Sequence, residues 1–202
     1  MATRALLFDL YGVIMHTQNE EAMADIEAAA GHAGPEFWDA YWVERHDYDA
    51  GLLDGPAYWA KVGERLGAPI ADVPAAIDAD TRGWLRPNPE MVDYIKELHA
   101  SGVTMGLLSN IPLELASAML DRAPWLQLFD PLVLSCRTGL AKPQPEIFAV
   151  ALEGLGVEPA DVLFIDDVEK NVAAARTCGI SGHVFADRAT LVPVLGEHLS
   201  AD

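Results

Sequence analysis

The chain has few of the residues that would cross-link it or attach it to a polyanion. Two cysteines occur in 202 residues. They lack CxxC spacing and a nearby histidine cluster, so neither a disulfide framework nor a zinc site is indicated, and buried thiols are expected. Lysine and arginine number 13 against 31 aspartates and glutamates, a net charge of −18, which disfavours binding to nucleic acid and to anionic membranes.

Long apolar runs, internal repeats and low-complexity segments are also missing. The apolar run at the N-terminus is too short for a membrane span and lacks the pattern of a secretory signal, so we expect a cytoplasmic protein with no membrane partner. Apolar residues make up 51% of the chain and charged residues 22%, as in globular proteins with a substantial core. The net charge does not exclude a small anionic substrate, because a lysine, a helix N-terminus or a bound cation can reverse the potential within one pocket.

Residues 5–14, with the sequence ALLFDLYGVI, form an apolar run interrupted by one acid, Asp9. A run of this length bounded by glycine is typical of a strand buried on both faces, as in parallel α/β sheets. Catalytic groups in such sheets lie at the carboxyl ends of the strands. Taken alone, Asp9 fits either a catalytic acid or an acid that caps a turn or a helix.

The periodicity of apolar residues divides the chain into two parts. Helical spacing dominates residues 16–86, whereas strands and helices alternate from residue 87 onward. We expect helices at 20–30, 36–45, 57–66, 89–100, 112–121, 146–155, 169–178 and 189–199, a further helix with Pro74 in its first turn, and strands at 103–108, 132–135, 161–165 and 182–185. This pattern predicts a Rossmann-like parallel α/β core of residues 1–15 and 87–202, with residues 16–86 as an all-helical insert. A binding site is expected between the insert and the strand ends.

Four short segments follow predicted strands and carry polar residues. They are FDLYGVI with Asp9, LLSNIP with Ser109 and Asn110, GLAKPQPEIF with Lys142, and FIDDVEKNV with Asp166 and Asp167. Each segment is a weak signal alone, but the ordered set resembles the haloacid dehalogenase superfamily, a large group of mostly phosphate-ester hydrolases. The resemblance covers nearly the whole chain. It implies an aspartate nucleophile, a Ser or Thr, a Lys and a paired acid on one sheet, and it implies that the insert of residues 16–86 is a helical cap domain between the first two motifs.

The acidic residues of this set indicate a metal site. Carboxylates that converge at strand ends would repel one another unless a cation lay among them, and oxygen ligands suit Mg²⁺. The resemblance implies that Mg²⁺ is held by Asp9, the backbone carbonyl of Tyr11 and Asp166, with Asp167 as a second or water-mediated ligand. The alternative is an ordinary pair of acids that caps the following helix.

Further residues are candidates for phosphate binding. Lys142 would neutralise both the nucleophile and the phosphate. Ser109 and the backbone amides of Asn110 and of the next residue would donate hydrogen bonds to phosphate oxygens. The alternatives are a solvated lysine before proline and a plain Ser-Asn-x-Pro helix cap.

Two candidates lie in or next to the helical insert. Arg45 is the insert residue most suited to meet an anion, although an arginine that is solvated or stabilises the insert also fits the sequence. His16, just after the first strand, would touch the site from the hinge or be a solvated linker residue. Most aromatic residues between positions 37 and 59 are expected in the core of the insert, which leaves one or two to face a ligand.

Tyr11 departs from the pattern of the family's phosphatases, in which a second acid stands two residues after the nucleophile. Tyrosine at this position resembles the hydrolytic 2-haloacid dehalogenases of the superfamily, but those lack the paired acids seen here at Asp166 and Asp167. We therefore expect a Mg²⁺-dependent phosphatase that acts on a small phosphorylated metabolite through an aspartyl-phosphate at Asp9. Without the second acid, acyl and aryl phosphates should react faster than alkyl phosphates.

Two other functions stay open. One is hydrolytic dehalogenation of small 2-haloacids, which the tyrosine at position 11 favours. The other is binding of a phosphorylated metabolite with little or no turnover, against which the presence of Asp9 and Lys142 argues. The sequence favours neither a monomer nor a homodimer.

Overall fold

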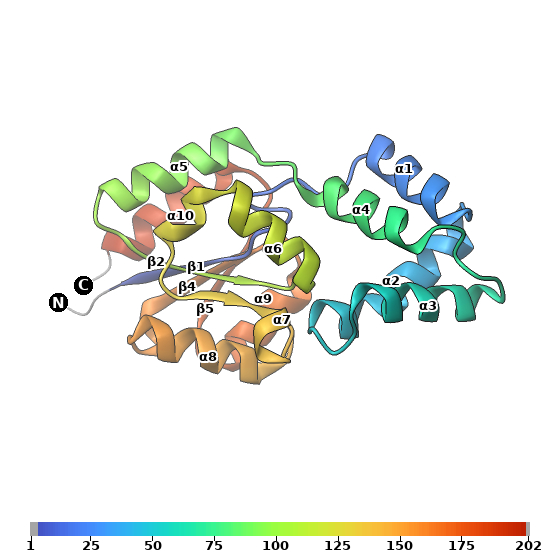
Figure 1. Ribbon diagram of the computed structural model, residues 1–202. Helices are drawn as coiled ribbons and strands as arrows, with labels where there is room; N and C mark the ends of the chain where they lie inside the picture. The colour runs from blue at the N-terminus through green and yellow to red at the C-terminus, as the bar shows by residue number, and fades with distance from the viewer. Residues whose placement is uncertain (1–3, 201–202) are drawn as a thin grey trace.

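A computed structural model of the chain describes residues 4–200, in which five parallel strands form one sheet with helices on both faces (Figure 1). The strands are β1 (Ala5–Phe8), β2 (Thr104–Ser109), β3 (Leu132–Leu134), β4 (Val162–Asp166) and β5 (Ser181–Val184). Their order in the sheet is β3-β2-β1-β4-β5. The predicted parallel α/β core is confirmed, and β1 lies at its centre, paired with β2 on one side and β4 on the other.

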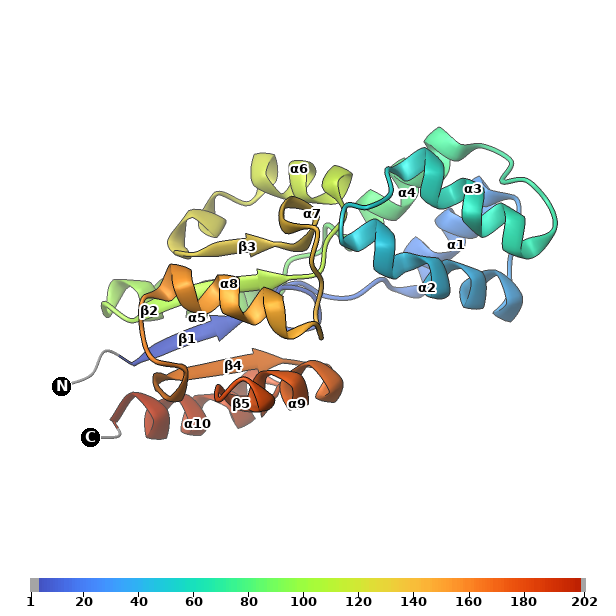
Figure 2. The same cartoon turned by 90° about the horizontal axis from the view of Figure 1, so that it is seen from below.

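Two apolar layers attach the helices to this sheet. One layer joins the sheet to α5, α6 and α10, above the sheet in Figure 1, and the other joins it to α8 and α9 below. Figure 2 shows the sheet from below, with α8 in front of it. The bounds are α5 (Pro89–Ala100), α6 (Leu113–Arg122), α8 (Pro145–Leu155), α9 (Glu169–Thr177) and α10 (Arg188–Ser200). Side chains of β1 alternate between the layers, because Leu6 and Phe8 belong to the first and Ala5 and Leu7 to the second. All four are fully buried, as expected for a central parallel strand.

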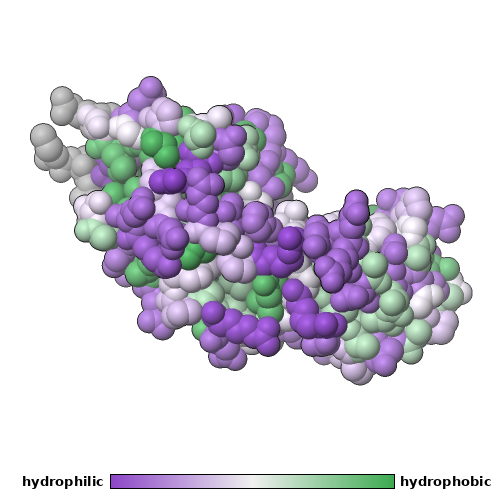
Figure 3. Space-filling model, turned by 90° about the horizontal axis from the view of Figure 1, so that it is seen from above, coloured by the Kyte–Doolittle hydropathy of each residue, from purple (hydrophilic) through white to green (hydrophobic). Residues whose placement is uncertain are grey.

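Four helices between the first two strands lie beyond the carboxyl ends of the sheet (Figure 1). They are α1 (Glu20–Ala30), α2 (Pro35–Asp49), α3 (Gly55–Leu66) and α4 (Val73–Trp84). Their apolar faces form a separate cluster that contains the fully buried rings of Tyr41, Tyr58 and Trp59. Residues 16–86 are called the helical unit below, and Figure 3 shows them as a smaller lobe beside the core. The assignment of this unit as a cap domain stays a prediction.

Local sequence signals account for the starts of several helices. Side chains of Asn19, Asp54, Asp72 and Asn88 each accept a hydrogen bond from the backbone N–H three residues further on, which satisfies a donor that the helix leaves free. Gly31 and Gly67 end α1 and α3 with φ values of 72° and 70°, in the left-handed region that glycine adopts most readily.

The structure differs from the sequence-based expectations at a few places. α2 continues to Asp49, and the strand predicted at 132–135 ends at Leu134 because Ser135 starts the short helix α7 (Ser135–Thr138). Two short 3₁₀ helices, η1 (Pro124–Leu128) and η2 (Pro159–Asp161), were not expected. The expectation of buried thiols is wrong, because both cysteines are partly exposed. Within residues 4–200, no helix combines the length and the apolar character that crossing a membrane requires.

Candidate active site

The carboxyl ends of the central strands bring two of the predicted aspartates and the predicted lysine together. Asp9 follows β1, Asp166 ends β4, and Lys142 lies in the loop between α7 and α8. The Lys142 Nζ atom is 2.7 Å from Asp9 Oδ1 and 2.7 Å from Asp166 Oδ2. All three side chains are buried, so their charges interact more strongly than they would in water.

Burial and pairing shift the pKa values of these groups. Burial raises the pKa of Asp9 to about 7, and the charge of Lys142 opposes this shift while that of Asp166 adds to it. Burial alone would lower the pKa of Lys142, but the charges of Asp9 and Asp166 raise it above its ordinary value. The lysine therefore stays protonated, and a further cation near Asp9 would favour the ionised carboxylate that a nucleophile requires.

Asp9, Asp166 and Asp167 together offer oxygen atoms suited to a hard cation. One carboxylate oxygen from each residue lies within 4.8 Å of the other two. Three carboxylates around one lysine leave an excess of negative charge, and Asp167 is the most exposed of the three acids. Burial and the charge of Asp166 raise the pKa of Asp167, which indicates that its ionised form needs a further positive partner. This donor set fits Mg²⁺.

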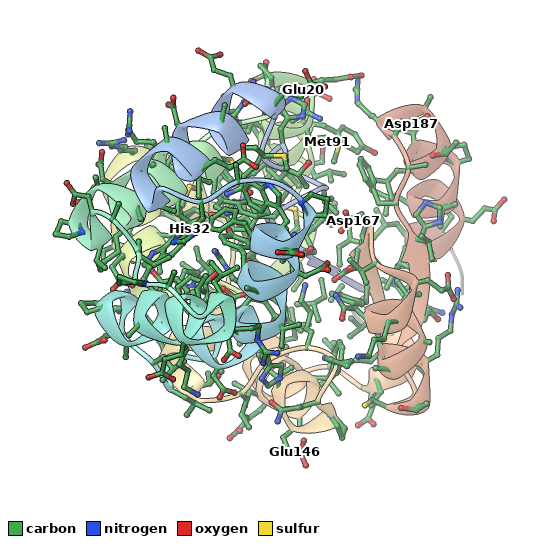
Figure 4. All side chains as sticks on the ribbon, turned by 90° about the vertical axis from the view of Figure 1, so that its right-hand side faces the viewer. Glu20, His32, Met91, Glu146, Asp167 and Asp187 are labelled. Atoms are coloured by element: carbon green, nitrogen blue, oxygen red, sulfur yellow. The ribbon has the colours of Figure 1, made fainter. Side chains whose placement is uncertain are left out.

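Gly12 allows Asp167 to lie close to the loop that follows β1. Its φ angle is 84°, and a Cβ atom at this position would lie 2.1 Å from Asp167 Oδ2. The positive φ favours glycine here, and a larger residue would also have to displace the Asp167 carboxylate. Figure 4, seen from the side of the helical unit, labels Asp167 between the blue helices of that unit and the red helices of the C-terminal part. The FDLYGVI segment thus supplies Asp9 and also the space for a second acid.

Two asparagines position the charged groups. The side chain of Asn110 donates to the backbone carbonyl of Lys142 at 2.9 Å and accepts from its backbone N–H at 2.8 Å. Asn171 Nδ2 donates to both carboxylate oxygens of Asp166, at 3.1 and 3.0 Å, and the backbone N–H of Val168 donates to Asp166 Oδ1 at 2.8 Å. Sequence reasoning gave Asn171 no role, although it belongs to the FIDDVEKNV segment and lies in the first turn of α9.

The segment around Ser109 differs in part from the expectation. Ser109 is fully buried, and its hydroxyl lies 3.5 Å from the Asn110 carbonyl oxygen, a long contact. The amide of Ile111, expected to donate to a phosphate, donates to Ser135 Oγ at 2.8 Å. That expectation is wrong because a serine in the interior already accepts this hydrogen bond. Ser135 Oγ also contacts the backbone oxygen of Asp49 and so joins the core to the helical unit.

A cavity of about 260 Å³ separates these groups from the helical unit. Residues of the core on one side include Asp9, Tyr11, Asn110, Lys142, Asp167 and Asn171, and residues of the helical unit on the other include Trp42, Arg45, Asp49 and Trp84. Trp42 therefore faces the cavity, while Phe37, Tyr41, Tyr48, Tyr58 and Trp59 are buried in the unit. This confirms the expectation that most aromatic residues of the insert form its core.

Tyr11 projects into this cavity from the core. Its ring packs edge-on against Trp84, with the centroids 5.0 Å apart and the planes at 68°. The hydroxyl is buried and has no hydrogen-bond partner within the described residues 4–200. Burial raises the pKa of Tyr11 above its ordinary value, so the phenol is neutral near pH 7.

The two candidates from the helical unit and its hinge lie in different surroundings. Arg45 lines the cavity, but its Nε atom is 2.8 Å from Asp49 Oδ1 and its Nη1 atom is 2.8 Å from Asp80 Oδ2. These pairs favour the second role that the sequence allowed, stabilisation of the helical unit. His16 is exposed and lies outside the cavity lining, whereas its neighbour Thr17 is part of it.

The fold is a Rossmann-like parallel α/β sheet with a helical insertion, and it carries a cluster of aspartates and a lysine at the strand ends. More narrowly, the chain belongs to the haloacid dehalogenase-like hydrolases, because the sequence profile of this family matches residues 3–179. The resemblance that the four motifs indicated is therefore confirmed.

Proteins of known structure or activity resemble this chain over most of its length. The sesquiterpene phosphatase astK of Aspergillus oryzae is 27% identical over 184 residues, 91% of this chain and 90% of that protein. A haloacid dehalogenase family enzyme of Bacteroides thetaiotaomicron, in complex with magnesium and inorganic phosphate, has a TM-score of 0.76 at 22% identity, over 94% of this chain and 99% of that one. The L-2-haloacid dehalogenase of Xanthobacter autotrophicus, with chloropropionic acid covalently bound, has a TM-score of 0.67 at 21% identity, over 98% and 85%.

Proposed function

We propose that this hydrolase is a Mg²⁺-dependent phosphatase that cleaves small phosphate monoesters through a covalent intermediate on Asp9. The observation that carries the proposal is the convergence of three carboxylates around one lysine at the carboxyl edge of the sheet. Such a site is too negative to accept a phosphate without a cation, and its oxygen atoms suit Mg²⁺. The similarity to a phosphatase over 91% of the chain supports this chemistry.

Asp9 is the nucleophile in this proposal. One of its carboxylate oxygens attacks phosphorus, and the new O–P bond forms as the bond from phosphorus to the leaving oxygen breaks. The leaving oxygen takes a proton from solvent. Water then attacks the aspartyl-phosphate, which releases inorganic phosphate and restores the Asp9 carboxylate. The Lys142 ammonium, 2.7 Å from Asp9 Oδ1, balances the charge on the phosphate oxygens.

The cation would be held by the carboxylates of Asp9, Asp166 and Asp167 and by the backbone carbonyl of Tyr11. When bound there, it supplies positive charge to the phosphate oxygens and screens the repulsion among the acids. Asn171 keeps Asp166 oriented through two hydrogen bonds, as expected of the outer partners of a metal ligand.

Tyr11 determines which leaving groups the proposed enzyme accepts. It occupies the position where the family's phosphatases carry an acid, and its neutral phenol with a raised pKa is a poor proton donor near neutral pH. Acyl and aryl phosphates, whose leaving groups depart without a proton, should therefore react faster than alkyl phosphates. We also propose that residues 16–86 act as a cap, because Trp42, Arg45 and Trp84 of this unit line the cavity opposite Asp9.

Hydrolysis of small 2-haloacids is the second candidate, and Tyr11 is the observation that favours it. A halide leaves without a proton, so the absence of an acid at this position would not slow that reaction. The three carboxylates argue against it, because the carboxylate of a haloacid would enter a site with a negative excess.

Two assays on the native chain and on Asp9→Asn test the proposal. We expect phosphate release from para-nitrophenyl phosphate that requires both Mg²⁺ and Asp9. Chloride release from chloropropionate without phosphate release would favour the dehalogenase. Neither activity in the native chain would favour a protein that binds a phosphorylated metabolite without turnover.

A further inference from the structure

The cavity beside Asp9 is lined by charged and by aromatic residues. The charged residues are Asp9, Lys142 and Asp167 of the core and Arg45 and Asp49 of the helical unit. The aromatic residues are Trp42 on α2, Trp84 on α4 and Tyr11 of the core. The Trp84 centroid lies 5.0 Å from that of Tyr11 and 6.2 Å from that of Trp42, both edge-on. The three rings therefore form a continuous apolar wall within reach of the nucleophile.

Two apolar side chains at this cavity remain open to solvent. Trp42 is 52% exposed and Val168 is 46% exposed, whereas Trp84 is only 8% exposed. Trp42 belongs to the helical unit, and Val168 belongs to the core, in the loop between β4 and α9. A ligand that filled the cavity would contact both side chains, and removing their apolar surface from water is favourable.

The polar groups near the aromatic wall are already paired or repel anions. Arg45 is the cationic side chain of the helical unit among the described residues that line the cavity, and Asp49 and Asp80 occupy its guanidinium at 2.8 Å each. The same guanidinium lies 5.7 Å from the centroid of Trp84. Asp49 also lines the cavity, and its negative charge disfavours a second phosphate or a carboxylate on the ligand.

We infer that the cavity accepts phosphate monoesters whose organic part is one apolar group, about the size of a single ring. This inference rests on the proposed function and names the substrate class of the same site. The phosphate lies at Asp9 and Lys142, and the apolar group lies against Trp42 and Val168. The volume of about 260 Å³ is slightly below the range of about 300–1,000 Å³ for drug-sized ligands, which sets the size of the organic part. Trp42 is then a specificity-determining residue.

A comparison of two alkyl phosphates tests the apolar site while the class of leaving group stays the same. Benzyl phosphate and glycerol phosphate both release an alcohol, but only the first carries an apolar ring. With Mg²⁺ present, we expect kcat/KM of the native chain to be at least about ten-fold higher for benzyl phosphate. Trp42→Ala should lower the ratio of the two values about ten-fold, mainly through KM of benzyl phosphate, and Trp42→Phe should keep most of it.

Val43 provides the matched control. It follows Trp42 on α2 and is 58% exposed, but it lies outside the cavity lining. Val43→Ala should leave both kcat/KM values unchanged. Equal values for the two phosphates in the native chain, or an equal loss of both in Trp42→Ala, would overturn the inference.

A binding measurement keeps this test independent of turnover. If no phosphate ester gives Asp9-dependent turnover, the proposed phosphatase function fails, and calorimetry with non-hydrolysable phosphonates decides the substrate class alone. Binding of benzylphosphonate to the native chain at least about ten-fold more tightly than dihydroxypropylphosphonate would support the apolar site. Equal affinities, or no binding of benzylphosphonate, would overturn it.

Discussion

Two largely buried clusters in this molecule share one composition, a basic side chain between two aspartates. The core cluster consists of Lys142, Asp9 and Asp166, and the helical cluster consists of Arg45, Asp49 and Asp80. The nitrogen–oxygen distances are 2.7 Å in the core cluster and 2.8 Å in the helical cluster. Similar charges at similar distances therefore occur on both sides of one cavity.

The helical cluster is closed by further protein groups. Tyr41 donates its hydroxyl hydrogen to Asp80 Oδ1 at 2.6 Å, and Gln18 and Trp84 donate to the same oxygen at 2.9 and 3.2 Å. The Arg45 guanidinium also lies over the rings of Tyr41 and Tyr48, 5.2 and 5.3 Å from their centroids. Hydrogen-bonded and stacked in this way, the cluster holds helices α2 and α4 together.

The charges of the core cluster are satisfied by the protein less completely than those of the helical cluster, and we call the core cluster open for this reason. Members of both clusters line the cavity, but Asp167 adds a third carboxylate to the core side, so the excess of negative charge over the lysine is larger there. Low dielectric makes such an excess costly unless a ligand or a cation balances it. The comparison teaches that composition does not separate a structural charge cluster from a reactive one. The difference lies in whether the protein itself satisfies the charges.

Exchange of one aspartate in each cluster should give the largest difference in turnover between the two clusters. Asp9→Asn removes the nucleophile, and we expect kcat for para-nitrophenyl phosphate to fall by at least about 10⁴-fold with Mg²⁺ present. Asp80→Asn, the matched change in the helical cluster, should keep kcat within about ten-fold while the protein is folded, because Asp80 lies outside the cavity lining. Circular dichroism verifies folding of both variants. A similar loss of kcat in the two would contradict the distinction between the clusters.

Addition of an acid to the open cluster should increase turnover of one substrate class. Tyr11→Asp supplies a proton donor at the position where the family's phosphatases carry one. General acid catalysis typically contributes about 10²–10⁴-fold, so the rate with an alkyl phosphate should rise toward this range relative to the rate with an aryl phosphate. The measurement is the ratio of kcat/KM for ethyl phosphate and phenyl phosphate. An unchanged ratio would show that Tyr11 does not limit the leaving group.

Replacement of the basic residue sharpens the comparison, because the two clusters should lose different properties. Arg45→Met leaves Asp49 and Asp80 without their buried cation, and we expect the free energy of unfolding to fall by about 3–5 kcal/mol in urea titrations. Lys142→Met should lower kcat by about 10²–10³-fold, because it removes charge that stabilises the transition state. If Arg45→Met kept full stability, the helical cluster would not be structural.

The acids of the core cluster were predictable from sequence because strand ends fix their positions. Apolar runs bounded by turns locate β1 and β4, and parallel pairing brings the residues that follow them to one edge of the sheet. Asp9, Asp166 and Asp167 were expected together for this reason, whereas Lys142, which lies in a loop, was expected there only through the resemblance to the haloacid dehalogenase superfamily. The structure pairs Lys142 with Asp9 and Asp166 and brings Asp167 close to both acids. Their roles in catalysis and metal binding stay predictions.

The helical cluster was not predictable, because its members meet only through packing. Arg45 and Asp49 are four residues apart on one helix, a spacing that sequence reveals. The pairing of Arg45 with Asp80 depends on how α2 and α4 pack, which periodicity does not specify. The same limit explains why the role of Ser135 was missed. Its hydroxyl accepts a hydrogen bond from the Ile111 amide, which is 24 residues away in the sequence and follows a neighbouring strand.

Addition of Mg²⁺ should produce the smallest effect, and it tests the open cluster without any assay of turnover. A ligand that binds only the folded state at 100 times its Kd stabilises it by about 2.7 kcal/mol, which corresponds to about 5–10 °C in Tm for a chain of this size. We expect such a rise in the native chain. Asp167→Asn should lose most of it because the site keeps only two of its three carboxylates, whereas Asp80→Asn should retain it from a lower starting Tm. If Mg²⁺ raised the Tm of Asp167→Asn as much as that of the native chain, Asp167 would not be a ligand. If Mg²⁺ no longer raised the Tm of Asp80→Asn either, the two clusters would be coupled through the cavity.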